Sequence, residues 1–430
     1  MKQNLNNVVV VVVMFLCVTI YAQEQQVSSL LSNYGLGTTF SETTMVEKSQ
    51  GDLSVVTNNN DEVASIANPA LLSDLKLTSF SLSMQVLGAN VENMDSNYKS
   101  GAVSLANISL AVPLGSKGAF SLGLRNHSSV GFETSNSEFY NFGNGSVNQF
   151  YLSVGLNVTK NLSIGAQMNR YFGKTDKRQA FKGGIQKSTV FDQSYNVTGL
   201  STKIGAQYKQ PMFKTLEAVF GAYGVLAYKN KAKGESRFFE AVQTDVNTFS
   251  ELITRDSDGN IVDTAIEKDI SGEEKKSFKT VLGAGLGEKN HWFAGVSYEL
   301  QDAVSYTGNV FNQTTSSLIP VGFEASNKIS LGGYIIPKKY SLKSYFSRVA
   351  YRGGFKYENT GLTLNENSVK NLGISFGLGL PLGRRISYAN FSFELGRLGD
   401  FSKNKYQEEY FNVGIELSLS DKWFNKRVID

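Results

Sequence analysis

The chain contains almost no cysteine and little proline. Its only cysteine is Cys17, and six of its 430 residues are proline. A single cysteine excludes a disulfide framework and a cysteine-based metal site. The chain also has no Pro/Ser-rich stretch to mark a linker between domains.

The chain also has few histidines and a small net charge. The only histidines are His127 and His291, and the formal net charge is +4. Without a cysteine or a nucleophile elbow beside these histidines, the sequence shows no catalytic pattern, so neither an enzyme nor a cofactor is expected. A charge this small does not indicate a nucleic-acid partner.

No apolar run is long enough for a membrane-spanning helix. The run Val8–Ile20 is shorter than the roughly 20 residues that a helix needs to cross a bilayer. It follows Lys2 and precedes Tyr21-Ala22-Gln23, which predicts a signal peptide over residues 1–22, cleaved after Ala22. The alternative, a lipid-modified Cys17, is disfavoured because a small residue would be needed where Leu16 stands.

Apolar and polar residues alternate along several segments of the chain. In Phe411–Leu419 every odd position is apolar and every even position is small or polar. Side chains on a strand point alternately to opposite faces, so such a strand has one apolar and one polar face. The same pattern in Phe150–Val158 and Leu162–Asn169, separated by three residues, predicts a hairpin.

Extended along the chain, the pattern predicts about fourteen strands. They are expected to begin near residues 76, 101, 118, 148, 161, 199, 215, 277, 291, 327, 345, 369, 386 and 409. Short connections alternate with longer ones, which are expected at 88–100, 131–147, 174–198, 229–276, 305–326, 357–368 and 397–408. This rhythm and an even strand count are typical of a transmembrane antiparallel β-barrel, an all-β fold.

Several charges are predicted to face the lumen, because a charge on the lipid face is costly at mid-depth. These candidates are Arg125, Glu299, Arg348, Arg352, Glu394 and Glu416. They are interpreted either as structural ion pairs bracing the lumen or as a network that guides a substrate. The longest expected connection, 229–276, contains Asp256-Ser257-Asp258, part of a calcium-loop pattern, but Ile261 stands where glycine is needed, so no metal site is predicted.

Residues 23–75 do not alternate and end in a turn, Asn68-Pro69-Ala70. This tripeptide, after a glycine-containing stretch and before the first strand, resembles the FadL/PorV-type outer-membrane barrels of Bacteroidota (the OmpP1/FadL/TodX type). The resemblance implies that the segment folds into the lumen as a plug, or hatch, whose candidate residues are Asn68, Pro69 and Ala70. The alternative is a plain turn, since proline fixes φ and restricts the residue before it.

The predicted organisation is a signal peptide (1–22), a plug segment (23–75), a transmembrane barrel (76–420) and a periplasmic tail (421–430). In the transporter branch of the family that it resembles, small hydrophobic molecules cross the outer membrane. In the PorV branch, the barrel is a subunit of type IX secretion. The expected function is therefore passage of a hydrophobic molecule, and the alternative is an accessory role in secretion, gliding or barrel assembly. The expected partners are outer-membrane lipid, a hydrophobic cargo and, in the alternative, other outer-membrane subunits.

Overall fold

The computed structural model describes residues 29–58, 63–94, 97–135, 137–183, 187–213, 215–245, 248–252, 254–255, 261–262, 265–311, 320–383 and 387–421. The predicted signal peptide and all but the first residue of the predicted tail lie outside these residues.

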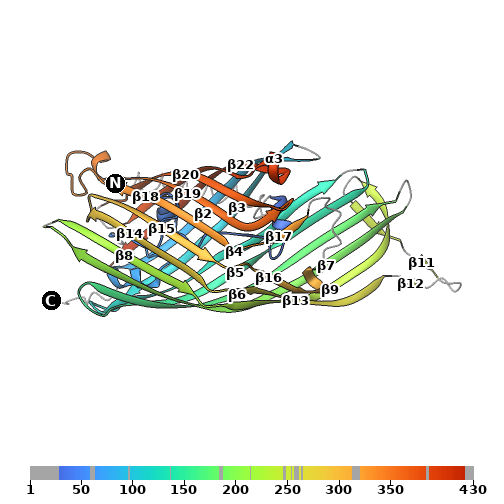
Figure 1. Ribbon diagram of the computed structural model, residues 1–430, viewed down its shortest axis with the longest axis horizontal. Coiled ribbons are helices and arrows are strands. Elements are labelled where there is room, and N and C mark those ends of the chain that lie inside the picture. The colour runs from blue at the N-terminus through green and yellow to red at the C-terminus, as the bar shows by residue number, and fades with distance from the viewer. Residues whose placement is uncertain are drawn as a thin grey trace, which may run out of the picture.

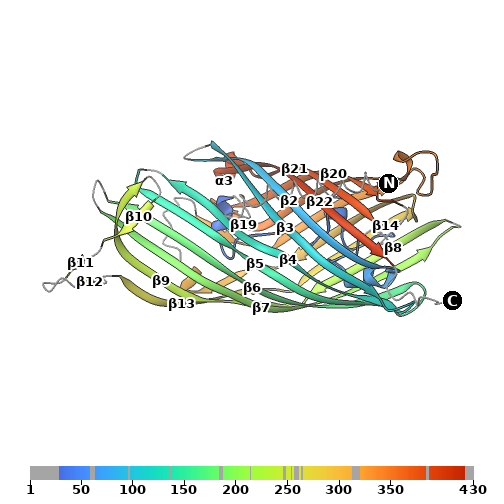
Figure 2. The same cartoon turned by 180° about the vertical axis from the view of Figure 1, so that it is seen from behind.

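Most of the described chain is strand, in one ring of 14 antiparallel strands (Figures 1 and 2). Ten members of the ring are single strands: β2 Thr78–Asn93, β3 Asn97–Pro113, β4 Gly118–Ser135, β5 Phe139–Asn157, β6 Leu162–Lys182, β7 Ser188–Pro211, β19 Ala350–Leu364, β20 Asn367–Pro381, β21 Tyr388–Gly399 and β22 Tyr406–Asp421. Four members are each made of two strands in line: β8 Leu216–Val225 with β9 Tyr228–Asp245, β13 Ile266–Lys276 with β14 Lys279–Glu288, β15 Trp292–Gln301 with β16 Ser305–Gly308, and β17 Val321–Phe323 with β18 Ser326–Ile335.

The ring closes between the first and last strands. β2 pairs with β22 in one register from Thr78↔Asp421 to Asn93↔Tyr406. Closure satisfies the edge N–H and C=O groups, which cannot remain unpaired in lipid. The prediction of a closed antiparallel barrel of about 14 strands is therefore confirmed.

Alternation along each strand separates an apolar outer face from a polar inner face. On β22, Phe411 and Leu419 are exposed, whereas Gly414, Glu416 and Ser418 are buried inside the ring. The same holds on β21, where Leu395 is exposed and Glu394 is buried. An outer belt of this kind matches a hydrocarbon environment, so the barrel is of the membrane-spanning type.

The remaining elements are short. They are η2 Leu30–Asn33, β1 Thr38–Thr39, α2 Met45–Lys48, η3 Pro69–Asp74, β10 Thr248–Glu251, β11 Thr254–Arg255, β12 Ile261–Val262, η4 Asn309–Phe311, η5 Phe346–Arg348 and α3 Phe401–Asn404. No helix of the described residues is both long and apolar enough to cross a membrane.

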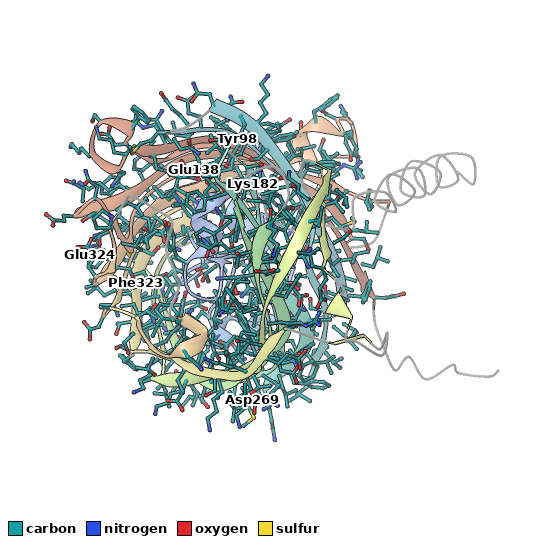
Figure 3. The ribbon with its side chains drawn as sticks, turned by 90° about the vertical axis from the view of Figure 1, so that its right-hand side faces the viewer. Tyr98, Glu138, Lys182, Asp269, Phe323 and Glu324 are labelled. Atoms are coloured by element: carbon teal, nitrogen blue, oxygen red, sulfur yellow. The ribbon has the colours of Figure 1, made fainter. Side chains whose placement is uncertain are left out.

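The longer connections lie at one end of the barrel, as predicted, but they are shorter than expected. Strands β4 to β7 extend well into the expected loops, and β19 and β20 meet at a two-residue turn, Asn365-Glu366, with φ of 50° and 61°. Strand pairs continue beyond the apolar belt. Neither face has to be apolar there, so the alternation of apolar and polar residues in the sequence stops before the strands end. Figure 3 looks onto this end, with Tyr98, Lys182 and Asp269 near its rim.

Candidate functional site

The segment before the barrel lies inside the ring. Residues 29–58 and 63–75, called here the N-terminal segment, appear in blue within the ring of strands (Figure 3). Its α2 helix begins with a capping box, in which Thr44 and Glu47 each bond the other's backbone N–H. Val55, Ala67 and Asn68 are completely buried.

Glycines of the wall bring the N-terminal segment very close to the strands. A methyl group added to Gly332 or Gly354 would overlap the backbone at Gln50, and one added to Gly414 would overlap Met45. Similar contacts occur at Gly155, Gly165, Gly205, Gly221, Gly283, Gly295 and Gly377. These ten glycines come from ten different members of the ring, so the segment touches most of the inner circumference.

The Asn68-Pro69-Ala70 turn lies against three of these glycines. Asn68 is the N-cap of η3: its Oδ1 atom accepts a bond from the Ala70 N–H at 3.1 Å. Its Nδ2 atom donates to the carbonyls of Val55 at 2.9 Å and of Ala206, on β7, at 3.3 Å. The turn is thus joined to both the segment and the wall.

Two inward cations of the wall meet one carboxylate of the segment. Lys203, on β7, forms an ion pair with Glu42, and an Arg125 nitrogen, on β4, lies 3.7 Å from the same carboxylate. Arg125 also donates to the carbonyls of Phe40 and Ser41 at 3.0 and 2.8 Å. Burial acts to raise the pKa of Glu42, but Lys203 and Arg125 outweigh it and hold that pKa well below its usual range.

A second ion-pair group is centred on Lys356 of β19. Its Nζ atom lies 2.6 Å from Glu394, on β21, and 3.2 Å from Asp52, in the N-terminal segment. Asp52 also accepts bonds from Ser41 at 2.9 Å and Thr43 at 3.1 Å, and Tyr410 donates to Glu394 at 2.9 Å. All three charged groups are therefore paired.

The other lumen candidates have different surroundings. Glu299, on β15, is paired with Lys279 at 2.6 Å and Lys328 at 3.5 Å. Arg352 is buried on β19, and the completely buried Glu416 accepts a bond from the Met45 N–H at 3.2 Å. Arg348 does not occupy its expected strand position. Because β19 starts at Ala350, Arg348 falls in η5, with its guanidinium 5.2 Å from the Tyr345 ring.

The sequence interpretation missed the partners of these charges. On the wall they are Lys203, Lys279, Lys328 and Lys356, all inward by the same alternation that identified Glu394 and Glu416. In the N-terminal segment they are Glu42 and Asp52, which no periodic pattern could have identified.

Glu47 is a buried carboxyl group with no close cation. It accepts bonds from the Ser65 hydroxyl at 2.6 Å and the Thr44 N–H at 2.8 Å. Burial raises the pKa of Glu47 to about 7, and these hydrogen bonds offset that effect only in part. Burial thus favours the neutral, protonated form of Glu47 inside the barrel.

The wall is incomplete between β3 and β4. The two strands pair only from Asn107↔Arg125 to Pro113↔Ala119, although β3 begins at Asn97 and β4 continues to Ser135. The β4–β5 register shifts between Asn126 and Ser128, a β-bulge that bends β4 at His127. From the bulge to the end of β4 at Ser135, the described residues of β3 and β4 form no hydrogen-bond ladder.

The N-terminal segment takes the place of β3 along the free edge of β4. β1 pairs with β4 through Thr38↔Ser129 and Thr39↔Ser128. The Phe40 N–H donates to the His127 carbonyl at 2.9 Å, and the Ser29 N–H donates to the Gly131 carbonyl at 3.0 Å. Part of the edge is thus satisfied by the interior segment and not by the wall.

Two apolar clusters include residues from this part of the segment. The first contains Val91, Leu364, Val369 and Tyr406, with Leu30, Leu31, Tyr34 and Tyr98 packed around them. The second contains Leu36, Val147, Tyr171, Tyr195, Val197, Ala232, Ile270 and Val310. The interior beside the open β3–β4 edge is therefore lined largely by apolar side chains, among which the buried Glu408 accepts hydrogen bonds from Ser29 and Tyr406. Among the described residues, no group of three His, Cys, Asp or Glu side chains is arranged to hold a metal ion.

Comparison with known proteins gives one family and one fold. A family model described as BamG matches residues 4–430. A search of curated proteins finds no significant match. The structure is similar to the CymD monoaromatic hydrocarbon channel, with 14% identity and a TM-score of 0.58, over 89% of this chain and 98% of that one.

Two further solved structures have the same fold. A Pseudomonas aeruginosa FadL homologue has 11% identity and a TM-score of 0.60, over 88% of this chain and 98% of that one. The Pseudomonas putida toluene transporter TodX has 14% identity and a TM-score of 0.58, over 90% of this chain and 99% of that one. At these identities the likeness concerns the FadL-type barrel fold.

Proposed function

The chain belongs to the BamG family, and on that premise we propose that it is a non-enzymatic outer-membrane barrel that passes small hydrophobic molecules. The route runs from the outside into the apolar clusters and then sideways into the membrane between β3 and β4. The observation that carries this proposal is the β3–β4 ladder, which stops at Asn107↔Arg125 while both strands continue. The structurally similar CymD and TodX are described as a monoaromatic hydrocarbon channel and a toluene transporter, which agrees with such a cargo.

In this proposal the N-terminal segment is the plug. Its contacts with wall glycines leave little room for free diffusion along the axis. Its β1 covers the edge at which the cargo would leave, so passage requires β1 to separate from β4. Deletion of residues 24–70 is expected to raise conductance in planar bilayers, and an unchanged closed baseline would count against a plug.

A disulfide between β1 and β4 tests the sideways route. Thr39 and Ser128 are direct register partners, so Thr39→Cys with Ser128→Cys can fix β1 to the β4 edge. Uptake of toluene into proteoliposomes is expected to fall on oxidation and recover on reduction. A control pair at the rim, Val242→Cys with Ser250→Cys, joins β9 to β10 and is expected to leave uptake unchanged. Equal uptake by the oxidised and reduced Thr39/Ser128 variant would contradict the route.

The filled interior also favours a second candidate function, an accessory role in a larger outer-membrane machine. Three ion-pair groups and the glycine contacts pack the N-terminal segment firmly against the inner wall. Such packing suits a structural subunit of a machine for PorV-like secretion, gliding or barrel assembly. Purification in mild detergent separates the two functions. A stoichiometric co-purifying protein would support the accessory role, whereas a solitary barrel active in toluene uptake would support passage.

A further inference from the structure

The loop between β18 and β19 is the longest connection at the short-turn end of the barrel. It spans residues 336–349, whereas the other described connections at this end, such as 114–117, 158–161 and 289–291, are tight turns. In Figures 1 and 2 this orange loop curls away from the barrel end. A barrel needs only a short turn here, so the extra residues require another explanation.

The loop has a defined conformation of its own. The Lys338 N–H donates to the Ser347 carbonyl at 2.7 Å, which closes the loop at its base. Within it, the Ser341 N–H donates to the Lys338 carbonyl at 3.1 Å, and the Ser344 N–H donates to the Ser341 hydroxyl at 3.2 Å. The backbone of the loop is thus held in one conformation before any contact is made.

Three large apolar side chains of this ordered loop point away from the protein. The exposed fractions are 101% for Leu342, 78% for Tyr340 and 73% for Phe346. Leaving so much apolar surface in water is unfavourable, and a rigid loop cannot fold it away. An ordered, exposed apolar surface of this kind indicates a contact that the isolated chain lacks.

Every charge on the loop is positive. Lys338, Lys339, Lys343 and Arg348 lie within residues 336–349, which contain no aspartate or glutamate. Lys339 is held to Asn290 at 2.6 Å, whereas Lys338 and Lys343 have no acidic residue near them in the loop sequence. The missing contact must therefore offer both apolar surface and negative charge.

The loop rests against the outside of the wall. The Tyr351 hydroxyl donates to the Phe346 carbonyl at 3.1 Å, and Tyr351 faces outward on β19, since its neighbours Ala350 and Arg352 are buried. The Tyr345 hydroxyl donates to the carbonyl of Pro381, the last residue of β20, at 3.2 Å. The base of the loop therefore lies at the edge of the lipid-facing surface and not beneath the lumen.

We infer that the β18–β19 loop binds anionic phospholipid headgroups of the leaflet at the short-turn end, with Tyr340, Leu342 and Phe346 in the interfacial layer. Aromatic and lysine side chains together suit this layer, because the rings enter it while the ammonium groups stay with the phosphates. The inference rests on the membrane placement in the proposed function, and not on passage of a cargo.

An environment-sensitive fluorophore on the loop tests the inference. The full-length protein with Cys17→Ala and Leu342→Cys is labelled with NBD and placed in nanodiscs that contain brominated phosphatidylcholine, with or without phosphatidylglycerol. A matched label at Leu395→Cys, which is 62% exposed on the outer face of β21, reports whether the barrel itself is in the bilayer. The loop label is expected to lose emission in the bilayer, and to lose more when phosphatidylglycerol is present.

The charge requirement is tested with Lys338→Gln and Lys343→Gln together, which leaves the Lys339–Asn290 contact intact. This variant is expected to lose the dependence on phosphatidylglycerol while the Leu395 label stays quenched. Equal quenching of the loop label with and without phosphatidylglycerol would overturn the headgroup assignment. An unquenched loop label beside a quenched Leu395 label would overturn docking altogether. If neither label is quenched, the membrane placement in the proposed function fails as well.

Discussion

The Nζ atom of Lys356, on the barrel wall, lies 3.2 Å from the Oδ2 atom of Asp52, in the N-terminal segment. The contact is buried, and Glu394 completes it from the next strand but one. Through this pair the wall and the interior segment are joined by charge as well as by packing.

Asp52→Ala should therefore destabilise the folded barrel. It removes a buried carboxylate that also accepts bonds from Ser41 and Thr43. Breaking one side of a buried ion pair typically costs about 3–5 kcal/mol. Urea unfolding in detergent micelles measures this cost. Asp176→Ala is the control: it breaks an exposed pair with Lys174 and should cost less than about 1 kcal/mol. Equal costs for the two variants would contradict the buried role of Asp52.

Gly354→Ala should loosen the N-terminal segment without affecting the wall. The added methyl would overlap backbone atoms at Gln50 and Gly51, which cannot rotate away as a side chain would. The adjacent Gly353→Ala is the control, because its nearest neighbour would be the Ser375 carbonyl oxygen at 3.9 Å, an ordinary contact. Limited proteolysis of the segment should be faster in the first variant only. Identical digestion of both variants would show that the segment does not rest on Gly354.

Asn68→Ala should lower stability by about 1–3 kcal/mol, since it removes a helix cap, one buried hydrogen bond and one partly buried hydrogen bond. Asn68→Ser separates the two effects: serine can cap η3 but is too short to reach Val55 and Ala206. Thermal denaturation should rank the serine variant between alanine and wild type. A serine variant no more stable than alanine would mean that the cap contributes little.

Attachment of the N-terminal segment should weaken as pH rises through about 7. The pKa of Glu47 rises from 4.5 to about 7 on folding, so the folded state favours the protonated form. The resulting stabilisation is fully present below pH 4.5 and is lost as Glu47 ionises near pH 7. The groups that face it are the Thr44 and Ser65 hydroxyls, Lys203 on β7 and Glu416 on β22.

Glu47→Gln tests this pH dependence because glutamine stays neutral. Proteolysis of the segment should accelerate between pH 5 and pH 8 in wild type and much less in the variant. The same acceleration in both proteins would assign the effect to another group.

The wall could be predicted from sequence because lipid imposes a period of two on every strand. That rule identified Glu394 and Glu416 as inward residues and Phe411 and Leu419 as outward ones. It failed for Arg348, because the start of β19 was expected about five residues too early, which moved a turn residue into a strand. It also missed the turn at Asn365-Glu366, which has positive φ at both residues without the usual glycine.

The interior segment was beyond such a rule. Residues 29–58 have little regular structure, and their positions depend on contacts with strands hundreds of residues later. Glu42 and Asp52 find their cations only when β4, β7 and β19 are brought together. The charged groups of the wall could be predicted one by one, but their pairing could not.

The bond from the Met45 N–H to Glu416 joins residues 371 positions apart in the chain. Strand β22, which carries Glu416, is also the strand that closes the ring against β2. If the chain inserts from its N-terminus, the interior segment lacks its bond to Glu416 until β22, the final strand, is in place. Full seating of the segment therefore requires the same strand that closes the ring, and contacts this distant in sequence form slowly.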